Sequence, residues 1–248
     1  MEAGQFLPAV CGGEKRIGLP NPPSSSRISS NMKIVSVNVG LPRVVSWKGT
    51  SVSTGIFKSA VEGSVPVKTL NLRGDQQADL TVHGGPYKAV YGYPSEHYPF
   101  WRTKLPQADL SWGAFGENLT TEGLMEDALN IGDQLRIGSA LLEVKQPRVP
   151  CYKITIRFDR DDMIKRFIAS NTSGFYFSVV EEGEVGAGDP MEIVHRDPEH
   201  VSVADINHLY YGTSRSAELL QRAVNLEALP ASWRDYLRER ADRREHRG

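Results

Sequence analysis

Residues 131–137 read IGDQLRI and residues 187–193 read AGDPMEI, and the prediction of the fold starts from these two stretches. In each of them a Gly-Asp pair, which favours a turn, leads into a segment that alternates apolar and polar side chains. Alternation with a period of two is typical of a half-buried β-strand. Because neighbouring segments of a barrel are often joined in this way, the two stretches predict adjacent barrel strands.

Short strand-like segments separated by Gly, Pro and Asp extend from Met32 to about Arg196. The candidate strands are 33–39, 51–57, 65–70, 87–93, 135–145, 174–181 and 191–195. Only two helices are expected in this region, one after Pro94 and Ser95 and one that begins at Asp161. Many short strands with few helices favour a mainly β fold, an irregular closed β-barrel, over a doubly wound sheet.

After Pro198 the apolar residues follow a helical period. Ser202, with Asp205 three residues later, resembles a capping box at the start of a first helix. A second helix is expected around 217–224, and Pro230 begins a third. The sequence therefore predicts a C-terminal appendage of three short helices.

We divide the chain into a leader (1–31), a β-barrel domain (32–196) and a three-helix domain (198–248). The leader includes GLPNPPSSSRISSN at 18–31, a composition typical of disorder, and it lacks the pattern of a secretory signal. Met32 stands directly before the first strand and is a candidate natural start. A genuine flexible tail is the alternative.

Composition excludes several classes of protein. A net charge of −1 argues against a surface that binds nucleic acid throughout, and the apolar runs are too short to span a membrane. Acidic residues interleave with the arginines of 234–247, which is typical of a solvated helix face. Two cysteines exclude a disulfide framework and an iron–sulfur cluster held by this chain's own thiolates. We expect a soluble, cytoplasmic protein.

The segment QPRVPCYK, residues 146–153, is the most informative for chemistry. Cys151 is the only cysteine after the leader, and two prolines restrict the backbone just before it. Arg148 and Lys153 supply positive charge, which favours a thiolate. A thiolate acts as a nucleophile or as a soft metal ligand, and a buried structural cysteine is the alternative.

Two further motifs could line a pocket. DQQADLTVHGG, residues 75–85, places His83 before Gly84 and Gly85, whose backbone N–H groups could form an anion-binding nest. A tight turn with a surface histidine is the alternative. FGENLTT, residues 115–121, places Glu117 and Asn118 between apolar neighbours, as in a pocket wall or an ordinary loop.

Lys58 follows a predicted strand, where it could bind a phosphate as a point charge or be solvated.

Taken together, these motifs resemble the MOSC domain family, named for the C-terminal domain of molybdenum cofactor sulfurase. The resemblance is to its stand-alone bacterial branch, which confers resistance to 6-hydroxylaminopurine. It covers roughly residues 33–240 and includes the three-helix extension. The matching text lies at 75–85, 87–101, 115–121, 131–133 and 146–153.

The resemblance implies a barrel like the insert domain of pyruvate kinase, with a groove for molybdenum cofactor. It implies that Cys151 is a metal ligand or a sulfur carrier, in a protein that reduces N-hydroxylated bases. On this basis Lys58 and Arg148 are expected to hold the cofactor's phosphate or pterin edge. His83, Gly84, Gly85 and Asn118 would line the pocket, and His83 or Glu117 would donate a proton.

Since no flavin or cluster signature is present, electrons are expected from a separate reductase, and the substrate from small N-hydroxylated molecules. A homodimer is compatible with the sequence, whereas membrane and nucleic-acid partners are not expected. Three other hypotheses stay open. One is a carrier of cofactor or cysteine-bound sulfur, and another is pyridoxal phosphate binding through Lys58, Lys88 or Lys153. The third, ranked last, is a nucleic-acid regulator built on the three-helix tail.

Overall fold

The computed structural model describes residues 32–80, 83–214 and 216–245. The predicted leader, 1–31, lies outside the described residues. Within the described part, the strands are β1 (Lys33–Val39), β2 (Arg43–Trp47), β3 (Thr50–Thr54), β4 (Ser59–Val61), β5 (Ser64–Lys68), β6 (Asn71–Leu72), β7 (Val90–Pro94), β8 (Leu119–Glu122), β9 (Gln134–Ile137), β10 (Ala140–Pro147), β11 (Phe175–Glu181), β12 (Gly183–Gly186) and β13 (Met191–His195). The helices are α1 (Tyr98–Lys104), α2 (Lys153–Phe158), α3 (Met163–Ser170), α4 (Val203–Tyr211), α5 (Ala217–Asn225) and α6 (Ala231–Glu245), with short 3₁₀ turns η1 (Pro86–Lys88) and η2 (Ser95–His97).

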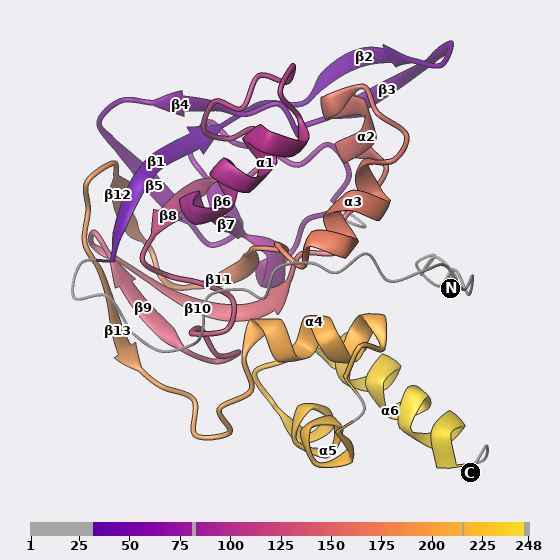
Figure 1. The fold of residues 1–248 in the computed structure, drawn as a ribbon. Helices are drawn as coiled ribbons and strands as arrows, with labels where there is room; N and C mark the ends of the chain where they lie inside the picture. The colour runs from indigo at the N-terminus through magenta and orange to yellow at the C-terminus, as the bar shows by residue number, and fades with distance from the viewer. Residues whose placement is uncertain (1–31, 81–82, 215, 246–248) are drawn as a thin grey trace.

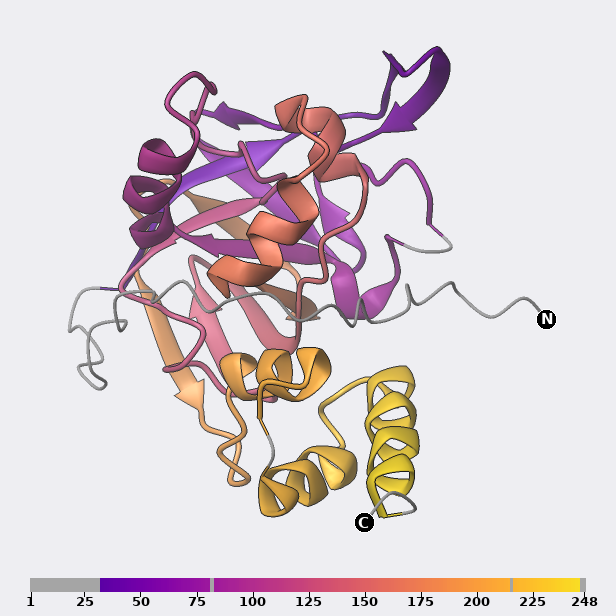
Figure 2. The same cartoon turned by 45° about the vertical axis from the view of Figure 1, so that its right-hand side comes forward.

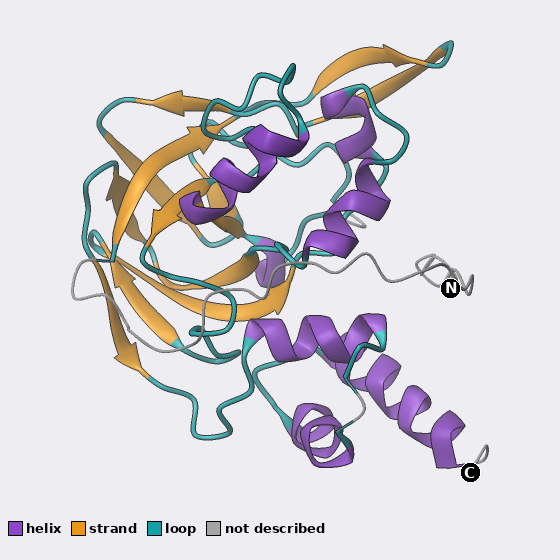
Figure 3. Cartoon of the chain, in the orientation of Figure 1, coloured by secondary structure: helices purple, strands orange, loops and turns teal. Residues whose placement is uncertain are grey.

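An eight-stranded mixed sheet forms the body of the protein, in the order β13-β9-β10-β11-β7-β8-β1-β4. Its named pairings are antiparallel except for β7 with β8. A smaller sheet joins β12, β5 and β6, and β2 pairs with β3 in a hairpin that projects from the body in both views (Figures 1 and 2). Figure 3 shows how strands dominate the upper part and helices the lower part.

Backbone hydrogen bonds connect β1 to the segment that precedes β13, at the far end of the sheet order. The Ile34 amide donates to the Asp189 carbonyl over 2.9 Å, and the Gly188 amide donates to the Ile34 carbonyl over 2.8 Å. These bonds bring β1, the second strand from one end of the curved sheet, next to the segment that leads into β13 at the other end. The expectation of a mainly β fold with a large sheet and few helices is confirmed, while a fully closed barrel stays a prediction.

One apolar core is shared by the sheet and the C-terminal helices. Val144 of β10 and Leu142 beside it belong to the same buried cluster as Ile206 of α4 and Leu237 of α6. The predicted capping box is present, because the Ser202 hydroxyl accepts from the Asp205 amide and the Asp205 carboxylate accepts from the Ser202 amide. The three helices are therefore packed onto the sheet by continuous burial of apolar side chains, the dominant stabilising contribution to folding.

A second buried cluster is aromatic and lies between β7, α1 and α3. Tyr93, Tyr98, Trp101, Phe115 and Phe167 are all almost completely buried within it. Ring centroids 4.8–6.2 Å apart join Tyr93 to Tyr98, Phe115 and Phe167 within this cluster, a spacing that favours attractive ring contacts. Phe167 of this cluster also lies 5.3 Å from the guanidinium of Arg148, a predicted site residue.

Two local expectations were wrong. The region between 32 and 196 contains α2 as well as α1 and α3, because the β-branched sequence KITIRF is helical where it is buried. The single strand expected over 135–145 is a hairpin of β9 and β10, turned at Gly138 with φ +57°. A Cβ at Gly138 would lie 2.3 Å from the Glu184 carbonyl oxygen, so glycine is required there. None of the described helices is both long and apolar enough to cross a membrane.

Candidate functional site

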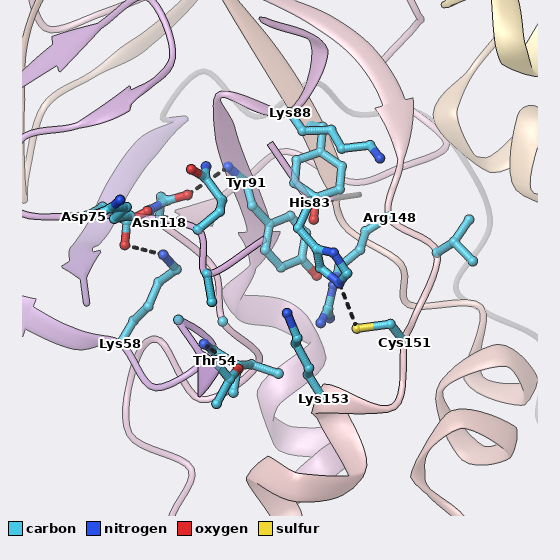
Figure 4. Close-up of a pocket in the computed structure, with 18 residues that line it drawn as sticks. Thr54, Lys58, Asp75, His83, Lys88, Tyr91, Asn118, Arg148, Cys151 and Lys153 are labelled. Carbon is cyan, nitrogen blue, oxygen red and sulfur yellow. Dashed lines mark hydrogen bonds and ion pairs between the residues drawn. The ribbon is translucent and has the colours of Figure 1, made fainter. Parts of the chain in front are cut away.

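A cavity of about 90 Å³ lies where the end of β3, the loop before η1 and the β10–α2 connection meet (Figure 4). Five predicted site residues line it: Lys58, His83, Asn118, Arg148 and Cys151. The structure therefore brings together side chains that are up to 93 positions apart in the chain. The other lining residues include Thr54, Asp75, Gln76, Lys88, Tyr91, Lys153 and Tyr176.

The Cys151 thiol lies beside the His83 imidazole, with 3.2 Å between Sγ and Nε2. Cys151 is half-buried and forms no disulfide. It sits in the short connection between β10 and α2, just after Pro147 and Pro150, so its backbone is held by the end of a central strand on one side and a helix on the other. A free thiol in this position is accessible from the cavity yet fixed in direction.

His83 is a neutral imidazole at neutral pH. Its pKa is lowered to about 4, chiefly by burial and then by the positive charges of Lys153, Lys88 and Arg148, while Asp79 opposes the shift. The other ring nitrogen, Nδ1, is buried without a hydrogen-bond partner among the described residues. His83 can therefore donate one hydrogen bond to a thiolate, or accept one from a thiol, without carrying a charge of its own.

Asp75 organises the opposite wall of the cavity. One carboxylate oxygen accepts from the Gly40 amide over 2.9 Å and from the Lys58 ammonium, and the other accepts from Asn118 Nδ2 over 2.9 Å. Asn118 in turn accepts from the Tyr91 amide through its own Oδ1. Burial lowers the pKa of Lys58, while its pairing with Asp75 opposes that shift. Lys58 is thus an ion-paired wall residue rather than a solvated one.

Arg148 carries a donor that the protein leaves unpaired. Its guanidinium lies over the rings of Tyr91 and Phe167, 4.9 and 5.3 Å from their centroids, and the residue is only 6% exposed. Its Nη1 is buried and has no hydrogen-bond partner among the described residues. An unsatisfied buried donor of this kind is costly, which indicates that a ligand or solvent molecule accepts from it.

Three predicted site residues, Glu117, Gly84 and Gly85, are not among the residues that line the cavity. Glu117 is completely buried and does not line the cavity; its carboxylate accepts from the hydroxyls of Tyr98 and Thr120 and from the amides of Gly113 and Phe115. Both carboxylate oxygens thus accept from donors within the protein.

Gly84 and Gly85 do not line the cavity either. Gly85 has φ +94°, and a Cβ on Gly84 would lie 2.8 Å from Leu80 Cδ2. Backbone geometry therefore requires glycine in the loop that carries His83, and an anion nest at these two residues stays a prediction.

Asp75 is the most important site residue that the sequence analysis did not predict. Its position as the first residue of the DQQAD motif is the sequence feature that could have indicated it. With Lys88 and Lys153 added, the described lining residues carry four Lys or Arg side chains against one carboxylate. The described residues contain no cluster of three or more His, Cys, Asp or Glu that could hold a metal ion. A metal at Cys151 would therefore take most of its ligands from a bound group.

Comparison with known proteins agrees with this architecture. Residues 79–192 match the MOSC domain model, and residues 201–243 match a YiiM-like, 3-alpha helix domain. YflK of Bacillus subtilis is 40% identical over 210 residues, covering 85% of this chain and 95% of YflK. YiiM of Escherichia coli is 37% identical, covering 75% and 84% respectively. The crystal structure of YiiM from Geobacillus stearothermophilus superposes with a TM-score of 0.70 at 36% identity, covering 85% of this chain and 99% of that one.

The fold and the sequence comparisons define a MOSC-domain protein. The chain belongs to the MOSC family, in its YiiM-type branch, which carries the additional three-helix domain. A protein of Gibberella moniliformis named as a reductase is also 33% identical over 181 residues, although this chain spans only 32% of its length.

Proposed function

We propose that this protein is a molybdenum-cofactor-dependent reductase of N-hydroxylated compounds, with Cys151 as the protein's ligand to molybdenum. The observation that carries the proposal is the fixed, half-buried thiol of Cys151 beside His83, in a cavity whose charged lining side chains are predominantly basic among the described residues. Thiolates are soft ligands that suit a transition metal, and basic side chains suit an anionic cofactor.

The lining residues fit such a cofactor. A pterin cofactor supplies its own sulfur ligands, so a single protein thiolate is sufficient where the described residues offer no larger ligand cluster. The unpaired Nη1 of Arg148 is a donor for a phosphate or pterin oxygen, and the residue's position over Tyr91 and Phe167 fixes its direction. Bound molybdenum cofactor would supply the two-electron chemistry.

The other lining residues would hold the Cys151 sulfur in place and orient the bound cofactor. His83 would keep the Cys151 sulfur in place through its Nε2 contact. The Lys58–Asp75–Asn118 network would fix one wall of the cofactor site, because the three side chains are almost fully buried and each is bonded to the next. Electrons would come from a separate reductase, with the protein acting in the cytoplasm. The reductase name of the much longer fungal relative supports an oxidoreductase function for the shared region.

A second candidate is a carrier of cofactor or of sulfur bound to Cys151. The half-exposed position of the thiol, open to the cavity, favours this alternative as well. A carrier would load Cys151 without catalysing repeated turnover of a substrate.

A turnover assay with 6-hydroxylaminopurine distinguishes the reductase from the carrier. The protein is produced in a host that makes molybdenum cofactor, and the reduction of the substrate is followed with an artificial electron donor. Steady turnover that is absent in Cys151→Ala supports the reductase. Loading without turnover supports the carrier, and a visible absorption band from a Schiff base would instead indicate pyridoxal phosphate.

A further inference from the structure

Two aromatic rings support the guanidinium of Arg148 in the cavity wall. The ring centroids of Tyr91 and Phe167 lie 4.9 and 5.3 Å from its Cζ atom, and Tyr91 also lines the cavity (Figure 4). Cation–π attraction acts through the face of a ring, so the placement of the rings sets the placement of the guanidinium. The direction of the unpaired Nη1 donor of Arg148 therefore depends on what holds these two rings.

Residues 171–173, between α3 and β11, hold both rings. The Tyr91 hydroxyl donates to the Ser173 carbonyl over 2.9 Å. Phe167 lies in the last turn of α3, and this helix ends where Asn171 takes the left-handed conformation with φ +53°. Asn is one of the few residues that adopt this conformation readily. A displacement of residues 171–173 would therefore move both supports of Arg148.

The three-helix domain holds residues 171–173 from the opposite side. Asn207 of α4 donates through its Nδ2 to Asn171 Oδ1 over 2.8 Å, and Asn171 Nδ2 donates to His208 Nε2 over 3.3 Å. Asn207 is only 2% exposed, so water does not compete for its contact with Asn171. Figures 1 and 2 both show the end of α3 facing α4. Both polar atoms of the Asn171 side chain are thus bonded to the C-terminal domain.

Adhesion between the domains does not require these amides. Apolar burial already joins α4 to the sheet, since Ile206 and Leu209 belong to the same core cluster as Val144 of β10. A buried amide costs free energy unless its atoms are paired, and Asn207 Oδ1 has no partner among the described residues. What the contact of Asn207 with Asn171 adds to apolar packing is a fixed direction, because a hydrogen bond weakens steeply when its geometry changes.

Tyr211 gives a second sign that α4 lies close to Arg148. It follows Asn207 by four positions, so both residues share one face of the helix. Burial and the neighbouring Tyr210 raise the pKa of Tyr211, while the charge of Arg148 opposes that shift. The electrostatic field of Arg148 therefore reaches the same face of α4 that holds Asn171.

We propose that the three-helix domain positions Arg148 for binding in the cavity, with Asn171 as the positioning residue through which the domain acts. The domain fixes the Asn171 side chain, residues 171–173 fix the two rings, and the rings fix the guanidinium. No bound cofactor is needed for this relay. The proposal therefore goes beyond the proposed function and applies to a reductase and to a carrier alike.

The direct test is an NMR measurement on the unloaded, full-length protein. The rings of Tyr91 and Phe167 shift the side-chain resonances of Arg148 away from those of a free arginine, and loss of these signals in Arg148→Lys assigns them. Asn171→Gly removes the amide while tolerating the left-handed backbone. In this variant the Arg148 resonances should move at least halfway toward the free-arginine values.

Asn207→Leu tests the same contact from the other domain. It keeps a side chain of similar size on α4 but removes the donor to Asn171, and it should shift the Arg148 resonances in the same direction. Asn207→Ala takes the place of either variant if that variant does not fold. Unshifted Arg148 resonances in either folded variant overturn the proposal.

A matched control separates positioning from general stability. Ser202→Ala removes the capping box at the other end of the same helix, so it should lower the urea midpoint but leave the Arg148 resonances in place. Lys104→Ala, which removes an exposed lysine of α1, should change neither measurement. Equal shifts in Ser202→Ala and Asn171→Gly would mean that loss of stability alone moves Arg148, and would overturn the proposal.

Release of molybdenum from the loaded protein measures the consequence for binding, and this readout rests on the proposed function. Asn171→Gly should release molybdenum about tenfold faster than Ser202→Ala, as expected for one hydrogen bond lost through misdirection of Arg148. Equal release rates overturn the claim that the domain positions Arg148 for binding. If the unsubstituted protein retains no molybdenum, the proposed function fails, and the Arg148 resonances alone decide the positioning proposal.

Discussion

The Nε2 atom of His83 lies 3.2 Å from the Sγ atom of Cys151, and this contact joins two motifs 68 positions apart in the chain. It brings together the loop that begins at Asp75 and the connection between β10 and α2. Because the imidazole is neutral at neutral pH, it holds the sulfur by hydrogen bonding rather than by charge. The geometry thus presents a fixed thiol to the cavity.

The pH dependence of the free energy of unfolding should reveal the lowered pKa of His83 in the folded protein. Its pKa is about 4 in the folded protein, mainly through burial, and about 6.5 when unfolded, so the unfolded chain binds more protons between these values. Stability attributable to His83 is therefore lost as the pH falls from about 6.5 to 4. In His83→Gln the free energy of unfolding should vary less across this window, by about 1 kcal/mol after allowance for solvent screening. Urea titrations at several pH values measure it, and parallel curves for the two proteins would refute the assignment.

Replacement of Asp75 should weaken the fold as well as the site. Asp75→Asn leaves the buried Lys58 ammonium without its partner, which is expected to lower the free energy of unfolding by about 3–5 kcal/mol. The double variant Asp75→Asn with Lys58→Met removes the stranded charge and should recover much of that loss. Chemical denaturation measures the free energy of unfolding of the single and the double variant. If the double variant is as unstable as the single one, the ion pair is not the source of the effect.

Glu117 should behave as a structural residue. Burial raises its pKa, and its carboxylate accepts from four donors of the protein. Glu117→Gln keeps the shape but replaces one accepting oxygen by a donor, so a loss of about 1–3 kcal/mol in unfolding free energy is expected. The molybdenum bound per folded protein should not change. A large loss of turnover without a loss of stability would restore Glu117 as a candidate acid.

The sequence predicted those elements whose signal is local. β1 and β13 match the expected 33–39 and 191–195, because alternating residues and turn residues mark both ends. The capping box at Ser202 was recognisable for the same reason. By contrast, α2 was not expected, since its β-branched residues favour strands and only burial against the aromatic cluster makes it helical.

The site was predictable as a set of motifs but not as a set of contacts. Cys151, His83 and Arg148 line one cavity, as their motifs suggested. Whether the carboxylate of Glu117 points into that cavity or into the loop depends on donors up to 19 positions away, such as Tyr98. The pairing of Lys58 with Asp75 is similarly a product of tertiary packing, which neither motif contains on its own.

Molybdenum content tests the central claim most directly. The protein and its Cys151→Ala variant are purified from a host that makes molybdenum cofactor, and metal is measured by mass spectrometry per folded chain, with Lys104→Ala as the control. We predict that molybdenum accompanies the unsubstituted protein and Lys104→Ala, and that Cys151→Ala loses at least nine-tenths of it. Equal molybdenum in all three proteins would contradict the assignment of Cys151 as the metal ligand.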